Sequence, residues 1–232
     1  MIIVTGVSRG LGKAIAEHYL RNGQYVMGIG RSHDIVHSNF SFQKCDLSDL
    51  DQVKSMKFNV LTGAVTLINN AGIIGEIDRI SDQRELDIDE VLTVNVSAVA
   101  ILTNKVYNNS LDKNKFSLVN ISSGAAKRAI PSWAAYCASK AALNMYTETF
   151  YREELEKGFT PNVYAVAPGV VDTGMQKEIR SVSPQSFSAH ENFVRMKNEN
   201  ELFSAEEAAS RLAKLLEMEY SGEVNSDLRD IA

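Results

Sequence analysis

Short apolar runs alternate with amphipathic segments along most of this 232-residue sequence. Runs of about four to six apolar residues between turn residues are typical of strands that are buried on both faces. Strands that alternate with helices form βαβ units, and their parallel sheet is then covered on both sides. The pattern therefore predicts an α/β fold, a doubly wound parallel sheet with helices on both faces.

The expected elements follow the chain in this order. We expect strands at residues 2–5, 25–30, 42–45, 65–68, 117–121, 162–166 and, as a last short strand, 222–224. We expect helices at residues 13–22, 50–56, 87–108 and 205–218, and a further helix that carries Tyr136 and Lys140 and ends near residue 156. Residues 174–203 are polar with a helical tendency. No repeat, linker or low-complexity segment interrupts the pattern, so we expect one domain over residues 1–232.

Composition excludes several classes of function. The formal net charge of −5 argues against a nucleic-acid partner, because binding phosphates requires a basic face. Two cysteines and four histidines without ligand spacing predict neither a disulfide framework nor a metal site. Met1 leads directly into an apolar strand without a signal-peptide pattern, and no run approaches the ~18 apolar residues of a membrane span. We therefore expect a cytoplasmic protein that makes no membrane contact.

A glycine-rich turn joins the first strand to the first helix. Glycines stand at positions 6, 10 and 12, with Ser8, Arg9 and Leu11 between them. Glycines permit a tight turn and let the backbone approach a pyrophosphate at a helix N-terminus. The spacing is G-x-x-x-G-x-G rather than G-x-G-x-x-G. In a strand–turn–helix context this loop predicts binding of a nucleotide.

The end of the second strand predicts which dinucleotide is bound. A carboxylate there would hold a ribose 2′-hydroxyl, whereas an arginine accommodates a 2′-phosphate. The chain has Arg31 and Ser32 at this point and no acid, and Arg9 lies in the glycine loop. Two arginines where an acid is missing favour NADP(H), although both side chains are also compatible with ordinary surface charges.

Two further strand ends supply candidate cofactor residues. Asp46 and Leu47 follow the third strand, where the carboxylate either lies by the adenine amine or caps the next helix. Asn70, Ala71 and Gly72 end the fourth strand with small and amide residues at the place where a ribose would pass. Because the carboxyl ends of parallel strands share one edge of the sheet, we expect all of these residues to meet there.

Tyr136 and Lys140 stand four residues apart on a predicted helix, thirteen residues after the hydroxyl pair Ser122 and Ser123. An i,i+4 pair shares one helix face, so the ammonium can lie beside the phenol. We expect the lysine charge to bring the tyrosine pKa down from its usual value of about 10 toward the working range. The pair predicts general acid chemistry on a carbonyl or an alcohol.

Taken together, these residues resemble the short-chain dehydrogenase/reductase family over essentially the whole chain. The resemblance rests on the glycine loop, residues 69–72, Asn95, Ser123, Tyr136, Lys140 and the pair Pro168-Gly169. The chain is similar in particular to benzil reductase and sepiapterin reductase-like members, through residues 122–126, 133–136 and 167–176. The resemblance implies a single-domain Rossmann-type fold, with a cofactor half at roughly residues 1–115 and a catalytic and substrate half at roughly 116–232.

The resemblance also implies a role for each matching residue. Tyr136 would protonate the carbonyl oxygen, Ser123 would hydrogen-bond that oxygen, and Lys140 would lower the tyrosine pKa and bind the nicotinamide ribose. Asn95 would hold a water that links Lys140 to solvent, and Ser122 would point elsewhere. Tyr136 and Lys140 would thus also contact the cofactor, and the amide pocket of the nicotinamide would be shaped by Pro168, Gly169, Val171 and Thr173.

The substrate and the oligomeric state are less constrained. Ile130, Trp133, Met175 and the segment at residues 176–200 lie near the catalytic residues in sequence and are candidates for the substrate pocket. Trp133 suggests an apolar or aromatic substrate, and core packing explains it equally well. By family similarity, helices near residues 87–109 and 134–156 would pair across a two-fold axis in a homodimer.

Three functions are compatible with the sequence. The first is an NADP(H)-dependent carbonyl reductase that acts on a ketone or a benzil-like diketone. The second is a sepiapterin or other pteridine carbonyl reductase. The third is a non-catalytic NADP(H)-binding sensor, against which the intact set Asn95, Ser123, Tyr136 and Lys140 argues.

Overall fold

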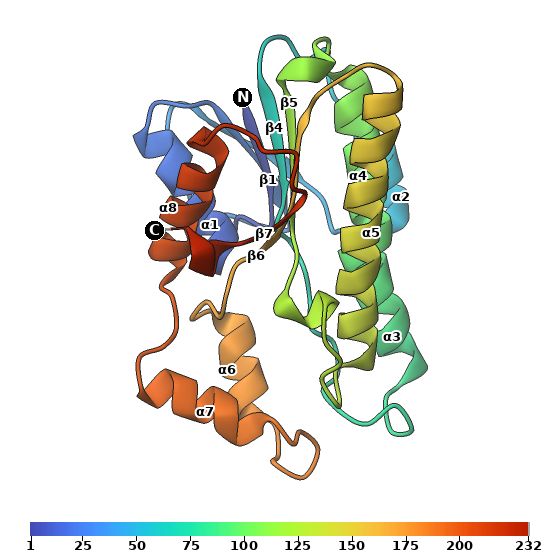
Figure 1. The fold of residues 1–232 in the computed structure, drawn as a ribbon, viewed down its shortest axis with the longest axis vertical. Coiled ribbons are helices and arrows are strands. Elements are labelled where there is room, and N and C mark those ends of the chain that lie inside the picture. Colours follow the sequence, from blue (N-terminus) through green and yellow to red (C-terminus); the bar gives the residue numbers. More distant parts are fainter. Residues whose placement is uncertain (232) are drawn as a thin grey trace.

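The computed structural model describes residues 1–231, and a seven-stranded parallel sheet forms its centre. The strands follow the spatial order β3-β2-β1-β4-β5-β6-β7 (Figure 1). Their bounds are β1 Ile2–Thr5, β2 Val26–Gly30, β3 Phe40–Lys44, β4 Val65–Asn69, β5 Phe116–Ile121, β6 Asn162–Ala167 and β7 Asn225–Asp227. The order reverses between β1 and β4, which defines the doubly wound arrangement and places a ligand crevice at this point. The predicted Rossmann-type fold class is confirmed.

Helices cover both faces of the sheet. One layer contains α1 (Gly10–Arg21) and α8 (Ala205–Glu217), and the other contains α2 (Leu50–Ser55), α4 (Ala98–Asn109) and α5 (Ala134–Glu156) (Figure 1). Alternate strand residues supply the two cores. Ile2 and Val4 pack in the cluster that includes residues of α1 and α8, whereas Ile3 packs in the cluster on the opposite face. This double burial explains why the strands read as continuous apolar runs.

The predicted helix at residues 87–108 is not one regular helix. It consists of α3 (Glu85–Leu92), a π-helical turn at Thr93–Ser97, and α4. A π-turn adds one residue to the helical repeat and occurs frequently at functional sites. Asn95 lies in this turn and is completely buried. Hydrophobic periodicity predicts the helix but cannot predict the extra residue.

The predicted last strand is misplaced by three residues. The structure has β7 at Asn225–Asp227, paired with β6, and residues 222–224 precede it. The three residues of β7 are polar and half-buried, because an edge strand packs against one neighbour only. The Val224 side chain is buried and its carbonyl accepts from the Ala165 amide at 2.7 Å, which explains the apolar signal just before the strand.

The polar segment at residues 174–203 folds into two helices, α6 (Gly174–Ser181) and α7 (His190–Asn198). Figure 1 shows them, in orange, beside the end of the sheet from which α5 begins. Aromatic residues of this segment, Phe187 and Phe193, join Trp133 and Tyr136 in a third apolar cluster. Within residues 1–231, no helix has the length and apolarity that crossing a bilayer requires.

Candidate active site

A cavity of about 370 Å³ lies at the carboxyl edge of the sheet. It is lined by the loops that follow β1, β2, β3, β4, β5 and β6 and by residues of α5 and α6. The predicted site residues that line it are Gly6, Ser8, Arg9, Gly10, Leu11, Gly12, Arg31, Asp46, Leu47, Asn70, Ala71, Gly72, Ser123, Ile130, Trp133, Tyr136, Lys140, Pro168, Gly169, Val171, Thr173 and Met175. Of the predicted set, Ser32 and Asn95 do not line it.

The glycine loop between β1 and α1 has no room for side chains at Gly6 and Gly12. Gly6 has φ +76°, in the left-handed region that favours glycine. A Cβ on Gly12 would lie 2.3 Å from the Gly6 carbonyl oxygen and 2.3 Å from Asn70 Nδ2. The loop therefore brings its backbone close to the N-terminus of α1, the arrangement that accommodates a pyrophosphate.

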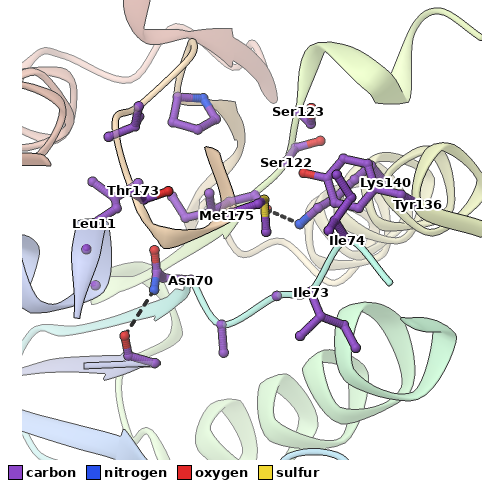
Figure 2. Close-up of a pocket in the computed structure, with 18 of the residues that line it drawn as sticks. Leu11, Asn70, Ile73, Ile74, Ser122, Ser123, Tyr136, Lys140, Thr173 and Met175 are labelled. Atoms are coloured by element: carbon purple, nitrogen blue, oxygen red, sulfur yellow. Dashed lines mark hydrogen bonds between the residues drawn. The ribbon is translucent and has the colours of Figure 1, made fainter. Parts of the chain in front are cut away.

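The loop after β4 is tied to the end of β1. Thr5 Oγ1 accepts from the amides of Asn70 and Ala71 at 3.0 and 2.9 Å. Asn70 Nδ2 in turn donates to the carbonyls of Thr5 and Gly6, at 3.0 and 3.4 Å. Figure 2 draws one hydrogen bond of Asn70 as a dashed line. These bonds hold the two loops together across the point where the strand order reverses.

Arg9 and Arg31 line the cavity, and both side chains are exposed. Neither guanidinium forms an ion pair with any carboxylate in residues 1–231. The acid nearest in sequence to the end of β2 is Asp34, whose Oδ2 lies 2.6 Å from Lys13 Nζ and which does not line the cavity. Two unpaired cations and no free carboxylate thus follow the first two strands.

Asp46 lines the cavity and does not cap α2. The capping residue is Asp49, which accepts from the amides of Asp51 and Gln52. Asp46 Oδ1 instead accepts from the amide and hydroxyl of Ser48, at 3.0 and 2.8 Å. Of the two interpretations left open by the sequence, the helix cap is therefore wrong for Asp46.

Tyr136 lies on the first turn of α5 and is buried. Burial raises the pKa of its phenol to about 12, and a hydrogen bond with the Ser123 side chain acts in the opposite direction. Ser123 Oγ also accepts from the Ala125 amide at 3.1 Å, which orients the hydroxyl. Ser122 donates instead to Asn144 on α5, away from Tyr136. Figure 2 shows Ser123 and Tyr136 on the same side of the cavity.

Lys140 Nζ is 5.7 Å from the centroid of the Tyr136 ring and donates to the Ile121 carbonyl at 2.8 Å. The side chain is only 4% exposed, and burial lowers its pKa to about 8. The sequence predicts that the lysine charge depresses the tyrosine pKa. In the structure the pKa of Tyr136 is raised instead of falling below its usual value, because desolvation of the buried phenolate is the largest effect on this group.

Asn95 does not line the cavity and is connected to it by hydrogen bonds with Ile73 and Ser139. Its Oδ1 accepts from the Ile73 amide at 2.9 Å, and its Nδ2 donates to the Ile73 carbonyl and to Ser139 Oγ at 2.8 and 3.0 Å. Ser139 donates to the Tyr136 carbonyl at 2.8 Å. A Cβ on Gly72 would lie 3.2 Å from Asn95 Oδ1 and 3.4 Å from Lys140 Nζ, so these two groups flank the same backbone.

The substrate end of the cavity is apolar. Trp133 lines it and also stacks on Phe187, with ring centroids 5.3 Å apart, so cavity lining and core packing both apply. Ile130 and Met175 line it with Trp133 as predicted. The segment at residues 176–200, which the sequence also proposes for the pocket, contributes Gln176, Ile179 and Phe193 to the lining. Sequence reasoning missed further lining residues, among them Ile73, Ile74, Arg128 and Val170.

Comparisons with known proteins agree with this geometry. Residues 1–183 match the family model of the short chain dehydrogenases. The benzil reductases of Bacillus cereus and Bacillus subtilis, both described as forming (S)-benzoin, are each 33% identical to this chain. The alignments cover 94% of this chain and 94% of the first relative, and 100% of this chain and 98% of the second.

A solved structure supports the same assignment. The crystal structure of a short-chain dehydrogenase/reductase from Saccharomyces cerevisiae is 28% identical and has a TM-score of 0.82, covering 99% of this chain and 96% of its own. The family model spans far more than half of the chain, and the fold and the cavity are those described above. The chain is therefore an oxidoreductase that belongs to the short-chain dehydrogenase family.

Proposed function

We propose that this protein is an NADP(H)-dependent carbonyl reductase that reduces an apolar or aromatic ketone or diketone, with Tyr136 as the proton donor. One observation carries the proposal. The Tyr136 and Ser123 side chains line the same cavity, which also contains the glycine loop and an apolar wall. A ketone and a dinucleotide could therefore bind next to each other in one cavity.

The reduction requires two hydrogens from different sources. NADPH, when bound, supplies a hydride from C4 of the nicotinamide to the carbonyl carbon and becomes NADP⁺. The electron pair of the C=O π bond moves to the oxygen, and the Tyr136 phenol donates the proton that completes the hydroxyl group. Ser123 donates a hydrogen bond to the same oxygen and stabilises its developing charge.

Lys140 and Asn95 support this proton transfer. A charged Lys140 beside the phenol stabilises the phenolate that remains after the proton has left. Asn95 positions Tyr136 and Lys140 indirectly, through Ser139 and the backbone of Ile73. We assign Tyr136 and Ser123 to the reacting oxygen, Lys140 to the tyrosine and the cofactor ribose, and Asn95 to positioning.

The residues present fit a nicotinamide dinucleotide that carries a 2′-phosphate. The close approach of Gly6 and Gly12 leaves space only for backbone where the pyrophosphate would lie. Asn70 holds the start of this loop through its hydrogen bond to the Thr5 carbonyl. Arg9 and Arg31 are the unpaired cations after β1 and β2, and Asp34 is held by Lys13. These observations favour NADP(H) over NAD(H).

The apolar wall supports a substrate with a hydrophobic body. The lining residues at this end include Ile74, Trp133, Ile179 and Phe193, which are buried in the same cluster as Tyr136. Aromatic rings pack favourably on such a wall. The similarity to the two Bacillus benzil reductases points in the same direction, so benzil is the first substrate to test.

The test is a spectrophotometric assay of the purified wild-type protein with NADPH or NADH and a panel of carbonyl compounds headed by benzil. We expect benzil-dependent oxidation of NADPH, with a much lower KM for NADPH than for NADH. No oxidation of NADPH with any ketone or diketone of the panel, together with measurable NADPH binding, would favour the sensor function instead.

A further inference from the structure

Gln176 is a polar side chain beside the apolar wall of the cavity, and the proposed proton transfer does not involve it. It lies on α6, beside Met175, and is 7% exposed. The residue lines the same cavity as Tyr136 and Ser123. A buried amide normally forms hydrogen bonds with both its oxygen and its nitrogen, so an unused group is informative.

The Gln176 amide is oriented by Arg180, one turn further along α6. Arg180 Nη1 lies 3.4 Å from Gln176 Oε1, and Arg180 Nη2 lies 3.5 Å from Asp172 Oδ1. Lys197 Nζ holds the other oxygen of Asp172 at 2.7 Å. A guanidinium has only donors, so the amide oxygen must face Arg180 and the NH₂ group must face elsewhere.

The NH₂ group has no acceptor among the residues that the structure describes. Among the described residues, the Gln176 side chain accepts one hydrogen bond, from Arg180, and donates none. In the described part of the chain, the unpaired side-chain atoms that are sealed from solvent are Asn69 Oδ1, Trp133 Nε1, His190 Nδ1 and Asn225 Oδ1. Gln176 Nε2 is not one of them, so this unpaired donor retains some exposed surface, and the residue lines the cavity.

We propose that Gln176 is a specificity-determining residue that donates a hydrogen bond to the second oxygen of a 1,2-dicarbonyl substrate. The inference rests on the proposed reductase function and deepens it. Tyr136 and Ser123 serve the oxygen of the carbonyl that is reduced, and Gln176 reaches the cavity from a different element, α6. A simple ketone leaves the Gln176 NH₂ group without a substrate acceptor in an apolar environment, whereas a vicinal diketone supplies one.

The test compares two substrates that differ only at the second oxygen. Benzil has two adjacent carbonyl groups, and in deoxybenzoin one of them is replaced by CH₂. The variant Gln176→Leu keeps the side-chain size and removes the amide. We expect kcat/KM for benzil to fall roughly tenfold in this variant, and the benzil to deoxybenzoin ratio to fall by a similar factor. Where deoxybenzoin is not reduced, its inhibition constant against benzil replaces its kcat/KM in the ratio.

Two variants and one measurement separate specificity from folding. Gln176→Met provides a second apolar replacement should the leucine variant fail to fold. Lys177→Gln changes the next residue of α6, whose side chain is exposed and does not line the cavity, and should leave the substrate ratio unchanged. The dissociation constant for NADPH should be the same in all of these proteins.

The outcomes distinguish this inference from the proposed function. Equal effects of Gln176→Leu on both substrates, or an unchanged kcat/KM for benzil, would overturn the role of Gln176 while leaving a ketone reductase. Failure of the wild-type protein to reduce either compound with NADPH would contradict the proposed function itself.

Discussion

Burial acts in opposite directions on the two ionisable groups of the site. It raises the Tyr136 pKa to about 12, because the phenolate is the charged form, and lowers the Lys140 pKa to about 8, because the ammonium is. The phenol is therefore protonated throughout the usual assay range and is ready to donate. Lysine is the group whose charge changes near neutral pH.

The first prediction concerns the pH profile of ketone reduction. Lys140 is charged below its pKa of about 8 and neutral above it. Since the charge stabilises the tyrosinate formed during the reaction, kcat/KM should be constant at lower pH and fall above about pH 8. The measurement is kcat/KM for benzil with saturating NADPH between pH 6 and pH 10.

The variant Lys140→Arg provides the matched test of this assignment, because arginine stays charged over the whole range. If this variant is active, the decrease above pH 8 should disappear. A decrease at the same pH in wild type and variant would assign the titration to another group.

The second prediction concerns the choice of cofactor. Replacing both Arg9 and Arg31 with glutamine removes the two unpaired cations that follow β1 and β2. The KM for NADPH should rise roughly a hundredfold, since two charge-assisted hydrogen bonds are lost, while the KM for NADH should change by less than about threefold. Steady-state kinetics with each cofactor measure both values. Equal increases would show that the arginines do not read the 2′-phosphate.

The third prediction tests the close contact around Gly72. A methyl group there would lie 3.2 Å from Asn95 Oδ1, which must shift by a few tenths of an ångström, and would contact Lys140 Nζ at 3.4 Å. Because proton transfer depends on position, Gly72→Ala should lower kcat for benzil reduction by roughly tenfold or more. The thermal midpoint should change little. A fully active alanine variant would show that this spacing does not matter.

At the scale of elements, the sequence predicts the regular parts well. Short apolar runs locate β1, β2 and β4–β6 to within two residues, because those strands are buried on both faces. The signal fails where burial is partial, as for the polar edge strand β7. It also fails where a single residue is inserted, as in the π-turn that carries Asn95. The contacts of Asn95 with Ile73 and Ser139 are therefore known only from the structure.

The fourth prediction concerns the packing of α4 against α5. Tyr107 on α4 donates to Glu154 on α5, a carboxylate that is 1% exposed and also contacts Lys157 Nζ at 2.7 Å. Tyr107→Phe leaves this buried carboxylate with one partner fewer and should lower the free energy of unfolding by about 1–3 kcal/mol. Urea denaturation measures the change. Tyr25→Phe, at an exposed position, is the control and should remain within about 0.5 kcal/mol of wild type.

At the scale of the whole molecule, the doubly wound sheet explains why distant motifs form one site. The glycine loop, residues 70–72, Ser123 and residues 168–173 each follow a parallel strand, so they meet at one edge. The expected parallel sheet and the positions of the motifs after its strands are enough to predict this convergence. The apolar wall could not be predicted in the same way, because Ile179 and Phe193 come from helices whose packing depends on tertiary contacts. A homodimer stays a prediction of the family resemblance.

The most direct test of the account is the variant Tyr136→Phe, which removes the phenolic hydroxyl and keeps the buried ring. NADPH-dependent reduction of benzil should fall by at least a thousandfold, because the oxygen loses its proton donor. Binding of NADPH, followed by fluorescence titration, should be unchanged within about twofold. Loss of turnover with retained binding is expected if Tyr136 has the proposed role of proton donor. Turnover at a rate comparable to wild type would contradict it.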